Sequence, residues 1–210
     1  MDKHAFYRAR MKLKSSVRIV FRTSFQYETL FVFEVQTSKV RVKKANGVEV
    51  RLLQPNDLPK LNKLKGPEAE KTEERLQARD LCFIGENGGH IVHYEWICLN
   101  EIFQNFFERK IRVSPNSAYV YNGYTVPKYR SRGISAAVLT NAANYLFQNG
   151  IEEMYVIIAS DNYPSLRTWQ KIGPRKLGEV TFIKLFNSRT YKCKAETPRD
   201  YAKLRQMLSI

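Results

Sequence analysis

The sequence predicts an α/β protein, in which strands alternate with amphipathic helices. Residues 119–126 are rich in aromatic and β-branched side chains and carry no charge, which is typical of a β-strand. Beyond Gly133, apolar residues recur at helical spacing until Gly150 supplies a stop signal. Residues 154–160 are an apolar run of the length expected for a buried strand. These observations predict a strand, a helix and a second strand in succession.

The N-terminal part of the chain predicts strands followed by two helices. Two apolar runs, at residues 17–21 and 30–35, are interpreted as strands or as a hairpin of an N-terminal extension. Residues 48–53 predict a further strand. The sequence Pro-Asn-Asp-Leu-Pro at 55–59 has the capping chemistry that opens a helix, and residues 68–78 predict a second, highly charged helix.

Hairpin signals come before and after the central strand-helix-strand segment. Two apolar runs, 81–85 and 91–99, flank the turn Glu-Asn-Gly-Gly at 86–89, which is a clear β-hairpin pattern. Residues 180–193 predict two closing strands with a turn at 187–189. We therefore expect one sheet assembled from both halves of the chain.

Composition is that of an ordinary globular protein. Apolar residues make up 43 % and charged residues 26 % of the chain, and 210 residues suffice for one good core. Residues 1–14 carry five Lys or Arg before any long apolar run, which argues against a secretory signal. The longest uncharged helical run, residues 133–151, is amphipathic rather than membrane-spanning. These features predict a soluble, cytoplasmic protein.

The cysteines and histidines predict no metal site and no disulfide framework. Their spacing matches neither a set of zinc ligands nor an even, paired arrangement of cysteines. The residues concerned are Cys82, Cys98, Cys193, His4, His90 and His93. We expect free thiols and no bound metal.

Positive charge is concentrated at the N-terminal end. The formal net charge is +15, and residues 1–46 contain eleven Lys or Arg against three Asp or Glu. Such a field attracts polyanions, among them a nucleotide, an acidic carrier protein, nucleic acid or an anionic membrane. We expect residues 1–46 to be a basic extension that packs on a core domain formed by residues 47–210.

The turn between the central strand and helix has the features of a phosphate-binding site. Pro127 cannot donate to a continuing strand ladder, so the chain leaves the sheet there. Gly133 has no Cβ, which lets a phosphate approach the main chain closely. Free N–H groups at the helix start, the helix dipole and the side chains of Arg130 and Arg132 all favour an anion. The sequence therefore predicts a pyrophosphate cradle.

These residues resemble a known motif. Arg130 to Ser135 is similar to the Arg/Gln-x-x-Gly-x-Gly/Ala turn of the Gcn5-related N-acetyltransferase (GNAT) superfamily, with Ser135 where glycine or alanine is usual. Asp161 to Gly173 is similar to the family's Asn-x-x-(small)-x-x-x-Tyr-x-Lys-x-Gly helix. The resemblance covers about residues 47–187, in the family's order and separation.

The resemblance implies a mixed, mostly antiparallel central sheet flanked by helices, and acyl transfer to an amine from acetyl-CoA or another acyl-CoA. It implies that main-chain groups at the strand end hold the pantetheine arm, that arginines neutralise the pyrophosphate, and that an asparagine holds the pantetheine side or fixes its helix. The donor-binding residues implied are Thr125, Val126, Arg130, Ser131, Arg132, Gly133, Ile134, Ser135 and Asn162.

The catalytic residues are less clearly indicated. Strand alternation places His93 and Glu95 on one face with apolar neighbours, which suggests an acceptor-side wall with His93 as base and Glu95 as its orienting or amine-binding partner. A solvent-exposed face or a structural polar pair is the alternative. The family's helix tyrosine is replaced by Trp169, whose indole is too weak an acid, so Tyr124 or Tyr121 is the candidate proton donor unless both are core.

Three functions remain open at this stage. The first is direct acyl transfer, by default of acetyl from acetyl-CoA, to a primary amine. The second is transfer of a longer acyl chain from acyl-CoA or an acidic acyl carrier protein to an amino acid or peptide, with the phenylalanines of residues 104–107 lining a tunnel. The third is a non-catalytic nucleic-acid-binding module, against which stands the lack of a reading motif. The acceptor and the oligomeric state stay open, with a dimer as one option.

Overall fold

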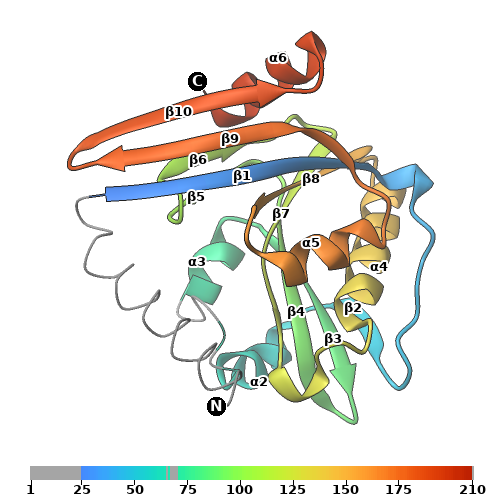
Figure 1. Cartoon of the computed structure of the whole chain (residues 1–210). Coiled ribbons are helices and arrows are strands. Elements are labelled where there is room, and N and C mark those ends of the chain that lie inside the picture. Colours follow the sequence, from blue (N-terminus) through green and yellow to red (C-terminus); the bar gives the residue numbers. More distant parts are fainter. Residues whose placement is uncertain (1–24, 65, 67–70, 210) are drawn as a thin grey trace, which may run out of the picture.

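The computed structural model describes residues 25–64, 66 and 71–209. An eight-stranded sheet dominates, in the order β10-β9-β1-β8-β7-β4-β3-β2, with a separate two-stranded sheet of β5 and β6 (Figure 1). The strands are β1 Phe25–Gln36, β2 Glu49–Leu52, β3 Leu81–Asn87, β4 His90–Cys98, β5 Glu101–Gln104, β6 Arg109–Arg112, β7 Ser117–Thr125, β8 Glu153–Ala159, β9 Arg175–Leu185 and β10 Ser188–Ala195. The helices are α2 Leu58–Asn62, α3 Thr72–Gln77, α4 Ile134–Gln148, α5 Tyr163–Gln170 and α6 Pro198–Leu208.

The expected mixed, mostly antiparallel sheet is confirmed. Every pairing among the described strands is antiparallel except that of β7 with β8, which is parallel and connected through α4. The predicted hairpin of residues 81–99 corresponds to β3 and β4, and the closing strands to β9 and β10. Apolar alternation and turn glycines were sufficient for these elements because both signals are local.

The range 1–46 contributes a strand to the main sheet. Residues 30–35 belong to β1, which lies between β8 and β9 and pairs with both. The strand expected at residues 17–21 lies outside the described residues. β1 is therefore an interior strand of the sheet rather than part of an appended hairpin.

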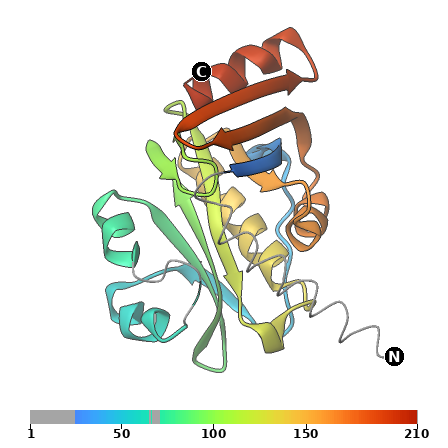
Figure 2. The same ribbon diagram turned by 60° about the vertical axis from the view of Figure 1, so that its left-hand side comes forward.

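Helices cover both faces of the sheet and divide the core in two. α4 and α5 pack on one face, where Val138, Leu139 and Trp169 are buried. α6 and α2 pack on the opposite face, where Leu204 and Leu61 join a second cluster. Figures 1 and 2 show α6 beside β9 and β10, well apart from α4. The sheet thus separates an α4 face from an α6 face.

The parallel pair β7 and β8 diverges at its C-terminal end. The two strands are in register from Ser117 opposite Glu153 to Val120 opposite Val156, and they do not pair beyond that point. A bulge in β7 accompanies the divergence, because the register with β4 shifts and Asn122 adopts a left-handed conformation with φ of 52°. Bulges bend a strand and increase its twist. The result is an opening in the middle of the sheet.

Two elements were not anticipated. The connection that contains residues 104–107 forms the β5–β6 hairpin, and Phe107 is fully buried in it. α6 begins at the N-cap Thr197, whose side chain accepts from the N–H of Asp200. The guanidinium of Arg175 binds the Asp200 carboxylate at 2.9 Å and holds its pKa below the usual range. The Thr-Pro-x-Asp sequence at the start of α6 is a local helix signal that was overlooked.

Gly178→Ala is expected to destabilise the sheet strongly. A Cβ at Gly178 would overlap the main-chain oxygen of Lys194 and lie 2.8 Å from Cα of Ala195 in the paired strand β10. Overpacking of this kind costs about 3 kcal/mol, because backbone atoms cannot rotate away. Thermal unfolding should show it. Gly89→Ala is the control, since φ is 76° but no atom lies within 4 Å, and an equal loss in both variants would contradict the prediction.

Candidate active site

A cleft opens where β7 and β8 diverge. Its volume is about 890 Å³, and its walls come from β4, β7, β8, α5 and the turn that leads into α4. Of the predicted site residues, the cleft brings together His93, Glu95, Tyr124, Thr125, Arg130, Ser131, Gly133, Ile134, Ser135 and Asn162. Val126 and Arg132 do not line it. A pocket of this size suits a small-molecule ligand.

The turn into α4 exposes main-chain N–H groups to the cleft. Ser131 and Gly133 both have left-handed backbones, with φ of 64° and 75°. Gly133 is the N-cap of α4, and no side chain caps the helix, so the first-turn amides of Ile134 and Ser135 have no partner within the helix. No atom lies within 4 Å of the position that a Cβ on Gly133 would take. The turn is therefore an open concavity of donors, as an anion site requires.

Cations surround this concavity. Arg130 donates from Nε to the main-chain oxygen of Thr125 at 3.1 Å, which holds its guanidinium at the cleft. Arg167 and Lys171, four residues apart on α5 and its C-cap, also line the cleft and are exposed. Arg132 instead stacks over Tyr129, with 5.3 Å between the guanidinium carbon and the ring centroid. The two α5 cations were missed by sequence reasoning, although their i, i+4 spacing was visible.

His93 and Glu95 form a buried polar pair at the cleft. Their exposed fractions are 1 % and 6 %. His93 Nδ1 is hydrogen-bonded to Thr125 Oγ1 at 2.7 Å, and its Nε2 lies 3.4 Å from a carboxylate oxygen of Glu95 without an aligned hydrogen bond. Burial raises the pKa of the Glu95 carboxyl, and His93 only partly opposes this. Ionising the Glu95 carboxyl in the folded protein therefore costs free energy.

This pair lies on the α4 face of the sheet and lines the cleft there. Gly85, opposite His93 in β3, approaches side chains of α4. A bulge at Val92 shifts the register with β3, so Val92 packs in the cluster under α4 and Ile91 packs on the α6 face. Regular alternation along the strand would place these two residues the other way round. A one-residue bulge reverses the facing of residues before it.

Gly123 makes room for the Glu95 carboxylate. A Cβ on Gly123 would overlap both carboxylate oxygens and lie 2.6 Å from the carboxyl carbon. Gly123 follows the bulge residue Asn122 in β7 and lines the cleft. Because Gly123 has no side chain, the Glu95 carboxylate can lie against the main chain of β7 at the point where β7 and β8 separate.

The two candidate tyrosines differ in their surroundings. The hydroxyl of Tyr121 donates to the buried Asp80 carboxylate, and burial together with this bond raises the pKa of Tyr121. The ring of Tyr124 is half-buried, 5.7 Å from the ring of Tyr94 and 6.0 Å from the guanidinium carbon of Arg130. Both tyrosines line the cleft. Among the described residues, no carboxylate is hydrogen-bonded to the hydroxyl of Tyr124.

Asn162→Ala is expected to weaken α5. Asn162 is the N-cap of this helix, and its side-chain oxygen accepts from the N–H of Ser165 at 3.3 Å. Loss of such a cap costs about 1 kcal/mol, whereas Asn162→Asp keeps an acceptor and should cost little. Chemical denaturation measures both variants. Equal losses for alanine and aspartate would show that the cap contributes nothing.

The described residues show none of the patterns of metal sites, disulfides or membrane-spanning helices. Within this part of the chain, no group of three or more His, Cys, Asp or Glu side chains is arranged to hold a metal ion. The cysteines are free, with Cys82 and Cys98 buried. None of the described helices is long and apolar enough to cross a membrane.

Comparison with known proteins agrees with this geometry. Residues 52–173 match the acetyltransferase (GNAT) family, and no curated protein matches the chain. A GNAT-family structure from Novosphingobium aromaticivorans aligns with a TM-score of 0.56 and 20 % identity, covering 76 % of this chain and 64 % of that one. The mixed sheet flanked by helices is the fold of a GNAT acetyltransferase domain. The chain belongs to the acetyltransferase (GNAT) family.

Other solved structures show the same fold. A GCN5-related N-acetyltransferase from Kribbella flavida has 11 % identity and a TM-score of 0.56, covering 82 % of this chain and 64 % of that chain. One from Sphaerobacter thermophilus has 13 % identity and a TM-score of 0.56, covering 87 % and 57 %. This chain therefore spans about three fifths of the length of these relatives.

Proposed function

We propose that this protein transfers an acyl group, by default acetyl, from acyl-CoA to a primary amine. The observation that carries the proposal is the cleft between β7 and β8, which runs from the open amide concavity at Gly133 to the buried pair of His93 and Glu95. One end of the cleft is built for phosphates, and the other holds groups that can move a proton. A thioester donor joined to a nucleotide by a pyrophosphate needs both.

The donor would be held mostly by main chain and cations. The amides of residues 131–135 would bind the pyrophosphate, with charge compensation from Arg130. Arg167 and Lys171 are placed to meet further phosphate charge at the cleft rim. The end of β7 at Thr125 would guide the pantetheine arm toward the β7 bulge, whereas Val126 lies outside the cleft and its N–H donates to the main-chain oxygen of Val92. Arg132 would have to leave its stacking position on Tyr129 to take part.

The reaction proposed is a direct transfer. The amine nitrogen attacks the thioester carbonyl carbon, the C–N bond forms and the C–S bond breaks. The amine loses one proton to His93 Nε2. In the proposed tautomer, His93 Nδ1–H donates to Thr125 Oγ1 throughout, and the Glu95 carboxylate stabilises the resulting imidazolium. The departing thiolate takes one proton from the Tyr124 hydroxyl. His93 then releases its extra proton to solvent and Tyr124 regains one from solvent, so that in the overall balance the amine loses one proton and the thiol gains one.

A longer acyl chain is the second candidate donor group. Phe106 and Gln104 from the β5–β6 hairpin line the cleft on the α6 face, and both are at least partly buried. They would contact an acyl chain that extends past the bulge. Phe107 is fully buried in the core and is not available for such a tunnel. An acyl carrier protein would supply the same pantetheine thioester without the nucleotide.

Binding and turnover measurements test the proposal together. Isothermal titration calorimetry with CoA should show binding, and mass spectrometry should show acetylated product when acetyl-CoA is supplied with a panel of primary amines. Parallel reactions with palmitoyl-CoA and with a loaded carrier protein separate the two donor classes. Absence of heat with every CoA species would end the proposal at its first step.

A further inference from the structure

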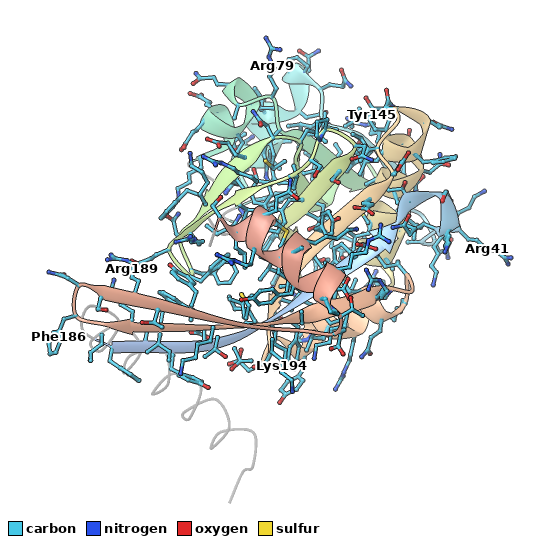
Figure 3. All side chains as sticks on the ribbon, turned by 90° about the horizontal axis from the view of Figure 1, so that it is seen from above. Arg41, Arg79, Tyr145, Phe186, Arg189 and Lys194 are labelled. Carbon is cyan, nitrogen blue, oxygen red and sulfur yellow. The ribbon has the colours of Figure 1, made fainter. Side chains whose placement is uncertain are left out.

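A cluster of exposed apolar side chains lies at the free end of β1, β9 and β10. We name Phe25, Tyr27, Leu185 and Phe186 the apolar tip; their exposed fractions are 49 %, 57 %, 53 % and 67 %. Phe25 is paired with Leu185, so these two side chains share one face of the sheet, and Phe186 occupies the β9–β10 turn. Figure 1 shows these strands extending beyond the rest of the sheet, and Figure 3 shows Phe186 at the extremity. The tip is a projecting, convex surface.

Positive charge lies behind the apolar tip along β10. Lys192 and Lys194 of β10 are exposed and share the face of Leu185, set back from the tip by several residues of strand. The chain that enters β1 at Phe25 is residues 1–24, with seven Lys or Arg against one Asp. Lys184 and Arg189, nearer the turn, both pair with Glu108, which leaves a net charge of one positive unit on these three residues. The apolar end is therefore followed along the strands by a cationic band.

We propose that the apolar tip docks on an anionic membrane surface. Exposed apolar patches on soluble proteins mark interaction sites, and aromatic side chains favour the bilayer interface. Lysines behind inserted aromatic residues lie at the level of the lipid phosphates, and a basic segment adds attraction to an anionic leaflet. Single-stranded nucleic acid instead favours a cationic groove with stacking platforms, and this end is convex with its nearest cations paired. The arrangement fits lipid better.

Vesicle co-sedimentation of the full chain tests this proposal. We expect binding to phosphatidylcholine vesicles that contain phosphatidylserine, and little binding to phosphatidylcholine alone. Phe25→Ser with Phe186→Ser should weaken binding by about tenfold or more, because two apolar side chains no longer leave water. Phe147→Ser is the matched control, since Phe147 is 51 % exposed near the C-terminal end of α4. Figure 1 shows α4 away from the free end of β9 and β10, so this variant should bind as wild type.

A second pair of variants tests the electrostatic part. Lys192→Glu with Lys194→Glu should lower binding to anionic vesicles, and added salt should narrow the difference from wild type. Thermal melts that match wild type show that each variant is folded. No binding to anionic vesicles at physiological salt would overturn the proposal. Unchanged vesicle binding by the double phenylalanine variant would also overturn it. The same holds if the wild-type protein binds no vesicles but forms a dimer that the double phenylalanine variant does not form.

Discussion

Gly133→Val is expected to abolish binding of CoA, with a loss of affinity of roughly a hundredfold or more, equivalent to about 2.7 kcal/mol. Gly133 has a φ of 75°, which a β-branched residue adopts only under strain. Its missing side chain also leaves the concavity open, with no atom within 4 Å of a built Cβ. Valine would place methyl groups where a phosphate must approach the amides. Isothermal titration calorimetry measures the effect directly.

The control for this variant lies at the other end of the same helix. Gly150 has a φ of 79°, and no atom lies within 4 Å of its built Cβ, so Gly150→Val has the same backbone strain without entering the cleft. It should lose stability but keep its affinity for CoA. Arg130→Ala removes charge and leaves the concavity open, so it should weaken binding by a smaller factor. Normal CoA affinity in folded Gly133→Val would show that the phosphates bind elsewhere.

Glu95→Gln is expected to reduce turnover by roughly a hundredfold or more while CoA affinity stays unchanged. A positioned acid-base group contributes on this scale, and glutamine cannot stabilise a positive charge on His93. His93→Gln should behave in the same way. Steady-state kinetics with acetyl-CoA and the best amine of the panel, beside calorimetry with CoA, separates the two effects. Unchanged turnover in both variants would place the base outside this pair.

The same substitution is expected to stabilise the protein at higher pH. The Glu95 carboxyl loses its proton near its ordinary pKa of 4.5 in the unfolded chain, but burial raises its pKa in the folded protein. Between the two pKa values the folded state binds more protons, so the free energy of unfolding falls as pH rises through that window. Glu95→Gln removes the ionisable group, and with it this decrease in the free energy of unfolding. Its melting temperature should therefore exceed that of wild type above the raised pKa.

A control and a contrary outcome complete this test. Glu101 is exposed, and its ion pairs with Lys110 and Arg112 hold its pKa below the usual range. Glu101→Gln should therefore change the melting temperature little at neutral pH, since exposed ion pairs contribute little. A pH dependence of stability that is the same in wild type and Glu95→Gln would show that Glu95 ionises in the folded protein as it does in the unfolded chain.

The local features of this protein were determined by sequence. The glycine turn before α4 and the hairpin of residues 81–99 could be identified because each depends on neighbours along the chain. The start of α6 is equally local, with Thr197 as its cap, and its Thr-Pro-x-Asp sequence is a helix signal that depends on neighbouring residues alone. In the candidate site, the amide-lined turn at residues 131–135 belongs to this class. Its amides come from one continuous stretch.

Tertiary structure decided what depends on partners distant in the chain. β1 lies in the interior of the sheet because it pairs with β8 and β9, and its own residues do not specify those neighbours. Bulges at Val92 and Asn122 depend on the register between strands, and they decide which face each side chain takes. Strand alternation alone places His93 beside Glu95, whereas Gly123 reaches the Glu95 carboxylate because the bulge at Asn122 sets the register of β7 against β4. The sequence determines which side chains are present, whereas strand pairing determines which of them lie close together.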